Sequence, residues 1–275
     1  MKTIAVTVCF FGKKFPWYFD FFVHSCKFNP SVDFIIFTDI KNYQRTIPPN
    51  IKFVYLTFAE INDLASEKLG FHVDIKHPYK LCDFKPAYGL IFSDYLQGYD
   101  YWAQSDIDII FGNIRDFLDH EKLSSYDFIS IRHDYTTGCF ALYKNNDLMN
   151  NMFKRSKDYK MVLSTSRHFC FDECNFKHDA LTAGQSIFEV ETEVETFTHI
   201  IRLAESKGEI NAHFDFILLE GIPGRIKFAD GRIIYKKKYE GILYHLYWLK
   251  SVYNPTKVSN RIPDNYSIST NRIYY

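Results

Sequence analysis

Two aspartates, Asp106 and Asp108, are the residues of this 275-residue chain whose types and spacing most directly indicate chemistry. They follow an apolar run at residues 99–104 and open the segment DIDIIFGNIRDF. Alternation along an extended segment points both carboxylates the same way, so that they can share one cation. Two hard oxygen ligands favour Mg²⁺ or Mn²⁺, whose other positions are commonly filled by phosphate oxygens and water. The pair predicts a metal site that holds a diphosphate, although two aspartates at a strand end can also cap a turn.

These carboxylates need a sheet to position them, and the first half of the chain supplies a suitable pattern. Short apolar runs typical of buried parallel strands occupy residues 4–10, 33–37, 51–56 and 99–104. Helix-like segments lie between them, at residues 15–28, at residues 57–69 with Thr57 and Glu60 as a capping box, and at residues 79–96 with a break at Pro86. Further strands are expected at residues 128–132 and 139–143, a helix at 147–155, and a D-G hairpin in IKFADGRIIYK. The order predicts an α/β sheet with right-handed crossovers, and Asp106 and Asp108 lie at its carboxyl edge, where such sheets place ligands.

The stretch YKLCDFKPAYGLIFSDYLQGYDYWAQSDID, residues 79–108, resembles a region of the metal-dependent GT-A glycosyltransferases. In that group a helix with an acidic and a basic residue precedes a glycine turn and a strand that ends in D-x-D. The stretch is most similar to the D-x-D sugar-binding region of yeast-type initiating mannosyltransferases and clostridial toxin glucosyltransferases. It is closer still to uncharacterised relatives encoded among bacterial surface-polysaccharide genes. The likeness covers residues 1–145 in pattern and is specific around residues 79–112.

The resemblance implies a GT-A-like α/β fold, with a Rossmann-like nucleotide-binding mixed sheet flanked by helices and with an acceptor-side and C-terminal extension. Residues 1–275 would form one catalytic domain, with a nucleotide-sugar half at 1–112, an acceptor-side half at 113–224 and a basic segment at 225–275 that closes the site. The implied activity is transfer of a sugar from a nucleotide donor, UDP-linked in the first instance, to a glycan or lipid-linked glycan acceptor in surface-polysaccharide biosynthesis. The implied cofactor is Mn²⁺ or Mg²⁺.

The same resemblance assigns the donor side of the site. Asp108 would bind the metal, Asp106 the metal shell or the sugar hydroxyls, and His245 would be a further metal ligand, with Lys250 on the diphosphate. Asp83, with either Lys80 or Lys85, would hold donor hydroxyls or phosphate, since the family pattern S-D-x-x-R is here Cys82-Asp83-Phe84-Lys85. The alternative for these helix residues is an ordinary surface salt bridge. The nucleoside would meet Phe11, Gly12 and Asp39, although Phe11 is also a natural core residue.

On the acceptor side, the strand TTGCFALY (residues 136–143) resembles the one that lines the acceptor cleft of GT-A folds. Asp172 and Glu173 match the place where such folds put an acidic residue near the acceptor hydroxyl, and an inverting enzyme would use a carboxylate there as general base. The alternative is an acidic loop, because residues 172–220 carry 11 acidic against 3 basic side chains.

Composition excludes some classes and suggests a compartment. With 33 basic and 33 acidic residues, the chain lacks the basic excess of a general nucleic-acid binder. No apolar run reaches membrane-spanning length, the apolar N-terminus has no cleavage site, and six scattered cysteines suit a reducing compartment, so we expect a cytoplasmic protein. Residues 225–275 carry 10 basic against 3 acidic side chains. This aromatic, cationic segment would serve either a diphosphate or peripheral contact with anionic lipids.

Three other interpretations compete with the glycosyltransferase. Ligand types for zinc occur at His168, Cys170, Cys174 and His178, but the H-x-C-x₃-C-x₃-H spacing does not match the usual finger pairings. A haloacid-dehalogenase phosphatase would carry its D-x-D near the N-terminus, not after about a hundred residues. A non-catalytic carbohydrate-binding or interaction protein on the same fold is the third, since aromatic residues, 18% of the chain, suit sugar rings.

Overall fold

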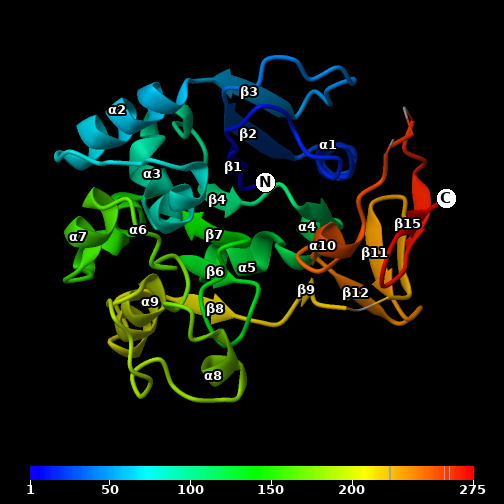
Figure 1. Cartoon of the computed structure of the whole chain (residues 1–275). Coiled ribbons are helices and arrows are strands. Elements are labelled where there is room, and N and C mark those ends of the chain that lie inside the picture. The colour runs from blue at the N-terminus through cyan, green and yellow to red at the C-terminus, as the bar shows by residue number, and fades with distance from the viewer. Residues whose placement is uncertain (223, 257, 260) are drawn as a thin grey trace.

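The computed structural model describes residues 1–222, 224–256, 258–259 and 261–275, and its framework is a seven-stranded sheet with helices on both faces (Figure 1). The strand order is β3-β2-β1-β4-β7-β6-β8. Strands β1 (Ile4–Cys9), β2 (Val32–Thr38), β3 (Ile51–Tyr55) and β4 (Tyr101–Ser105) pair in parallel. The predicted parallel α/β half is thus confirmed. Because the chain returns past β1 to form β4, the order reverses between these two strands, which is where open α/β sheets bind ligands.

The other half of the sheet makes it mixed. Strand β7 (Phe140–Lys144) runs antiparallel to both β4 and β6 (Phe128–Ser130), and β8 (Ala212–Phe214) pairs in parallel with β6. Residues 136–139 lead into β7, so they approach the sheet at the edge where β4 ends, since Ser105 pairs with Phe140. This antiparallel pairing brings the segment after residue 135 beside the predicted D-x-D pair.

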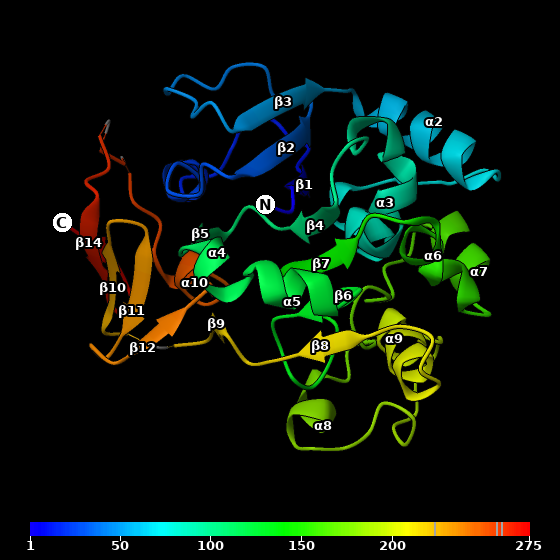
Figure 2. The same cartoon turned by 180° about the vertical axis from the view of Figure 1, so that it is seen from behind.

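Two apolar layers cover the sheet, and side-chain alternation along each strand divides its residues between them. In β4, Trp102 faces one layer and Tyr101 and Ala103 face the other. The first layer contains α2 (Phe58–Leu69), α3 (Tyr88–Ile91), α6 (Asp147–Asn150), α7 (Tyr159–Ser164) and α9 (Phe197–Ser206). The second contains α1 (Phe19–Cys26), α4 (Ile114–Phe117) and α5 (His120–Ser125). Figure 2 shows these helices from behind.

Local sequence signals account for several element ends. Helix α2 begins after Thr57, whose side chain accepts the Glu60 N–H while Glu60 bonds back to the Thr57 N–H, as predicted. The segment expected to be helical at 79–96 is instead the 3₁₀ helix Pro78–Ala87, followed by α3 and a 3₁₀ turn at Ser93–Tyr95. Pro86 lies inside that 3₁₀ helix. It cannot donate an i to i−4 hydrogen bond, which explains why a regular α-helix does not form there.

A small three-stranded sheet joins the middle of the chain to its C-terminal part. Strand β13 (Leu243–His245) lies between β5 (Ile109–Phe111), with which it is antiparallel, and β9 (Leu218–Leu219). Since β5 follows directly after Asp108, this pairing places the end of β13 beside the D-x-D segment. Helix α10 (Leu249–Val252) follows shortly afterwards, and α8 (His178–Thr182) lies at the bottom of the view in Figure 1, apart from the C-terminal sheet.

The C-terminal segment adds a five-stranded antiparallel sheet at one end of the molecule (Figures 1 and 2). Its strands are β10 (Ile226–Ala229), β11 (Arg232–Tyr235), β12 (Tyr239–Gly241), β14 (Asn265–Ile268) and β15 (Ile273–Tyr274). The predicted hairpin is confirmed, with Asp230 and Gly231 at positive φ in the turn between β10 and β11. The sheet shares an apolar cluster with Phe21 of α1 and Ile110 of β5. Lys257, one of the ten basic residues of the segment, lies outside the described residues.

Within the described ranges, no helix has the length and apolar character that crossing a bilayer requires.

Candidate functional site

Asp106 and Asp108 occupy the turn between β4 and β5, and backbone hydrogen bonds fix this turn from two directions. The Asp106 N–H donates to the carbonyl of Cys139 at 3.1 Å, and the Asp108 carbonyl accepts the N–H of Leu246 at 2.8 Å. The turn is therefore held both by the segment that leads into β7 and by the residue that follows β13. Both carboxylates lie at the carboxyl end of β4, as the sequence predicts.

His245 joins the two aspartates, although it lies 137 positions after Asp108 in the sequence. It pairs with Ile109 across β13 and β5, so its ring lies beside the turn. The ligating atoms of Asp106, Asp108 and His245 all lie within 4.8 Å of one another, and His245 Nε2 is 3.4 Å from Asp108 Oδ2. The structure brings together the three residues predicted to bind a metal.

Two residues that the sequence analysis missed orient His245. Its Nδ1 lies 2.7 Å from Glu220 Oε1, and the other oxygen of Glu220 accepts a hydrogen bond from Arg132 at 3.0 Å. A carboxylate on one ring nitrogen fixes the tautomer and turns the other nitrogen toward a metal. No motif marks Glu220, which is the last residue of the acidic segment, so only the fold reveals its role.

Two lysines compensate the charge of the aspartates. Lys250 Nζ lies 2.5 Å from Asp108 Oδ2, and Lys85 Nζ lies 2.6 Å from Asp106 Oδ1. Burial raises the pKa of Asp108, but the hydrogen bonds and charges of His245 and Lys250 outweigh burial and hold that pKa well below its ordinary value. Asp108 is thus a permanent anion in the ordinary pH range. Lys85 is the helix lysine that reaches the D-x-D pair.

Lys80 and Asp83 form a structural anchor instead. Both side chains have no exposed surface, and Lys80 Nζ donates to Asp83 at 2.7 Å and to the carbonyls of Val162 and Arg167 at 2.7 and 2.6 Å. Asp83 also accepts the N–H groups of residues 169 and 171. Unlike Lys85, whose partner Asp106 is 32% exposed, this pair has no surface that a donor could touch, so the predicted donor contacts of Lys80 and Asp83 are wrong. The alternative of an exposed salt bridge is equally wrong for this pair.

Of the three residues predicted to contact a nucleoside, two lie at the edge of the sheet and one lies in the core. Gly12 and Asp39 follow β1 and β2 at the same sheet edge as Asp106, and the Gly12 N–H donates to Asp39 Oδ1 at 2.9 Å. Phe11 is 4% exposed and packs in the core against Phe58, so its ring fills the core. Tyr18, which we did not predict, also belongs to this region. Burial, and after it the negative charge of Asp108, raises the pKa of the Tyr18 hydroxyl to about 12.

Lys85 connects the D-x-D pair to Asp172 directly, and to Glu173 through Gly138. Lys85 Nζ is 3.8 Å from Asp172 Oδ2 and donates to the Gly138 carbonyl, while the Gly138 N–H donates to Glu173 at 2.7 Å. A Cβ on Gly138 would lie 2.5 Å from Asp172 Oδ2, so the glycine permits this close approach. The predicted donor-side and acceptor-side acids thus belong to one continuous polar cluster.

The two acids differ in their protonation behaviour. Burial raises the pKa of Asp172 well above its ordinary value, and the charge of Lys85 only partly opposes this. Burial acts in the same direction on Glu173, but a hydrogen bond and the charge of His178 lower its pKa to about 2. Neighbouring groups whose pKa values are driven apart are characteristic of acid–base sites. Burial and the neighbouring charges thus act on the two acids in opposite net directions.

The residues at this edge fit a divalent cation. Two carboxylates and an imidazole suit Mn²⁺, and also Mg²⁺ with more of its shell from water and phosphate. Asp106, Asp108 and His245 would hold the ion, with Glu220 behind His245.

Comparison with known families adds a classification without a function. The model of the family described as a family of unknown function, DUF6625, matches residues 6–275. No curated protein matches the chain.

Proposed function

The chain belongs to this family, DUF6625, and from its own residues we propose that it is a metal-dependent, GT-A-like glycosyltransferase. It would transfer a sugar from a nucleotide donor, UDP-linked in the first instance, to a glycan or a lipid-linked glycan. The observation that carries the proposal is the convergence of Asp106, Asp108 and His245, with ligating atoms within 4.8 Å of one another. They come from two distant parts of the chain and meet at the strand-order reversal of the sheet.

Charge at the site supports a diphosphate as the ligand. Lys85 and Lys250 contact the two aspartates from opposite ends of the sequence. Asp106, Asp108 and His245 would hold a divalent ion, which would supply Lewis-acid stabilisation for the departing diphosphate. When a diphosphate binds, each lysine ammonium group would donate to a phosphate oxygen instead of an aspartate oxygen. The two lysines would then stabilise the charge of the leaving group. The site would take part in bond cleavage as well as in binding.

The fold is compatible with this chemistry. A mixed sheet with parallel strands β1 to β4 and one antiparallel strand, β7, is consistent with the nucleotide-binding sheet that the resemblance implies. Gly12 and Asp39, at the ends of β1 and β2, offer a backbone N–H and a carboxylate for ribose and base. We retain these two residues as nucleoside contacts.

The acceptor would approach from the side of Asp172 and Glu173. These acids adjoin the metal-binding residues through Lys85, so an acceptor hydroxyl there would lie close to the donor sugar. One of these two carboxylates would take up the hydroxyl proton in an inverting reaction. An acceptor attached to a membrane lipid would require peripheral docking, for which the basic residues of 225–275 are suited, and the enzyme would then work in the cytoplasm at the inner membrane face.

A panel of nucleotide sugars, incubated with the protein and Mn²⁺, tests the proposal. We expect one donor class to be hydrolysed slowly without acceptor, and Asp108→Asn to reduce this hydrolysis by at least 100-fold, the order of loss when one stabiliser of transition-state charge is removed. Asp119→Asn, at an exposed helix cap, is the matched control and should retain activity. If no donor is hydrolysed while a sugar polymer binds, the protein is the carbohydrate-binding module instead.

A further inference from the structure

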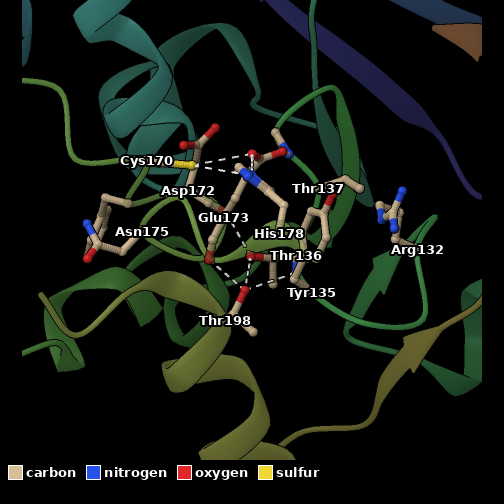
Figure 3. A network of polar contacts seen from close by, with 12 residues as sticks. Arg132, Tyr135, Thr136, Thr137, Cys170, Asp172, Glu173, Asn175, His178 and Thr198 are labelled. Atoms are coloured by element: carbon tan, nitrogen blue, oxygen red, sulfur yellow. Dashed lines mark hydrogen bonds and ion pairs between the residues drawn. The ribbon is translucent and has the colours of Figure 1, made fainter. Parts of the chain in front are cut away.

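A second cluster of metal-ligand types lies on the acceptor side, outside the D-x-D pair. Cys170 and Glu173 come from the loop after α7, and His178 is the first residue of α8. Figure 3 shows the Cys170 sulfur, the Glu173 carboxylate and the His178 ring facing one another, joined by dashed lines. Their ligating atoms lie within 4.8 Å of one another.

The separations match those of a tetrahedral zinc site. Zinc bonds of about 2.3 Å to sulfur and about 2.0–2.2 Å to nitrogen or oxygen place sulfur about 3.6 Å from the other ligands, and nitrogen about 3.4 Å from oxygen. Here Cys170 Sγ is 3.7 Å from His178 Nε2 and 3.4 Å from Glu173 Oε2. The imidazole and the carboxylate are 2.7 Å apart, a hydrogen bond that must lengthen by about 0.7 Å. Two of the three distances between ligand atoms, those from the Cys170 sulfur, are therefore already close to the values of a zinc site.

The surrounding loop holds these atoms in place. The Asn175 N–H donates to the Cys170 carbonyl, and the Gly138 N–H donates to the second oxygen of Glu173. Cys170, Asn175 and Phe176 all have positive φ, of 52°, 52° and 62°. Such conformations are costly for residues with side chains and persist where the surrounding structure requires them. Hydrogen bonds to the outer side of each ligand are the usual support of a metal centre.

We propose that Cys170, Glu173 and His178 bind Zn²⁺ as a three-ligand site whose fourth position is open. A thiolate and an imidazole are softer ligands than two aspartates, so this site selects zinc where the D-x-D site selects Mn²⁺ or Mg²⁺. The His178 side chain is 37% exposed, so solvent reaches this cluster from the side of the histidine. Metal binding displaces the Cys170 thiol proton, which passes to water, and forms the sulfur–zinc bond.

This set differs from the zinc quartet considered in the sequence. His168 lies 3.1 Å from the buried Asp83 and is turned toward Tyr79, not toward Cys170. Cys174 is buried in an apolar cluster with Tyr135, Leu181 and Ile187. Glu173 is the third ligand instead of these two residues. The sequence spacing of histidines and cysteines alone could not indicate this. The zinc proposal stands whether or not the chain transfers sugars, because it depends on none of Asp106, Asp108 and His245.

Cobalt substitution tests the site on the full-length protein, because Co²⁺ bound to a thiolate has an intense near-ultraviolet charge-transfer band. The metal-free wild type should bind one equivalent of Co²⁺ with this band, and Zn²⁺ should displace it. Cys170→Ser should lose the band. Cys174→Ser is the matched control and should keep it, and Cys139→Ser should keep it too, since that cysteine adjoins His245.

His178→Gln provides a variant that is independent of the cysteine, because this side chain is partly exposed and its loss should not unfold the protein. We expect its Zn²⁺ affinity, measured against a competing chelator, to fall at least tenfold. Absence of a thiolate band in the wild type, or a band that persists in Cys170→Ser, would overturn the proposal. So would a His178→Gln protein that is folded by circular dichroism and binds Zn²⁺ as tightly as the wild type.

Discussion

Replacing Lys80 with methionine tests whether this lysine is a buried anchor, as its geometry indicates. Methionine keeps most of the side-chain length but removes the charge and the donors. Lys80 donates to Asp83 and to two backbone carbonyls, and neither side chain of the pair has exposed surface. Lys80→Met therefore leaves Asp83 as a buried anion with one fewer partner. Breaking a buried pair in this way costs about 3–5 kcal/mol.

That cost is large beside the total stability of a folded domain, about 5–15 kcal/mol. For a chain of this length, about 2 °C of Tm is lost per kcal/mol, so we expect Lys80→Met to lower Tm by about 6–10 °C. Urea unfolding gives the free energy directly. The matched control is Lys68→Met, because Lys68 pairs with Asp94 at 2.8 Å on the surface. Exposed pairs contribute about 0–1 kcal/mol.

Acid unfolding gives a second measure of the same anchor. Burial raises the pKa of Asp83, but His168 and Lys80 outweigh it and hold the pKa below its ordinary value. A carboxyl whose pKa is depressed by folding stabilises the protein above its unfolded pKa, about 3.9, and loses that contribution as pH falls through the folded value. The wild type should lose stability below about pH 4 more steeply than Asp83→Asn. If Lys80→Met is within about 1 kcal/mol of the wild type, our assignment of the anchor is wrong.

Three further substitutions examine the polar cluster. Lys85→Met should weaken binding of a nucleoside diphosphate with Mn²⁺ by about 10- to 100-fold in calorimetry, since one charge-assisted hydrogen bond contributes about 1.5–3 kcal/mol. Unchanged binding would show that Lys85 does not contact the donor. Glu220→Gln should lower Mn²⁺ affinity by about 10- to 100-fold, because Glu220 orients His245. If the variant binds Mn²⁺ as tightly as the wild type, the contact between Glu220 and His245 does not support metal binding. Gly138→Ala places a methyl group 2.5 Å from Asp172 Oδ2. Donor hydrolysis should therefore fall, while the urea midpoint changes little. Full activity would show that the close approach of Asp172 to residue 138 is not needed.

The sequence predicts those parts of the fold that local signals determine. Apolar runs define β1 to β4, Thr57 and Glu60 define the start of α2, and Asp230-Gly231 defines a hairpin. The D-x-D pair is visible because both ligands lie on one short segment. By contrast, β5, β9 and β13 have two or three residues each, too few for a periodic pattern, so the sheet that carries His245 becomes visible only in three dimensions.

Burial decides the remaining assignments, and burial depends on contacts between distant segments. Lys80 and Lys85 are both plausible donor ligands in the sequence, but the loop at residues 162–171 closes over Lys80 and leaves Lys85 facing Asp106. Glu220 meets His245 only because β9 and β13 are neighbours. The trio of Cys170, Glu173 and His178 depends on positive φ values in a loop, which no spacing rule predicts.

Mn²⁺ binding in the presence of a nucleoside diphosphate tests the central claim most directly, because the claim is that Asp106, Asp108 and His245 form one metal site. Titration of the wild type should show Mn²⁺ and UDP each increasing the affinity for the other, and both Asp108→Asn and His245→Gln should lose this coupling. Measured on folded protein, wild-type binding of UDP that is independent of Mn²⁺, or coupling that survives in both variants, would contradict the proposed function.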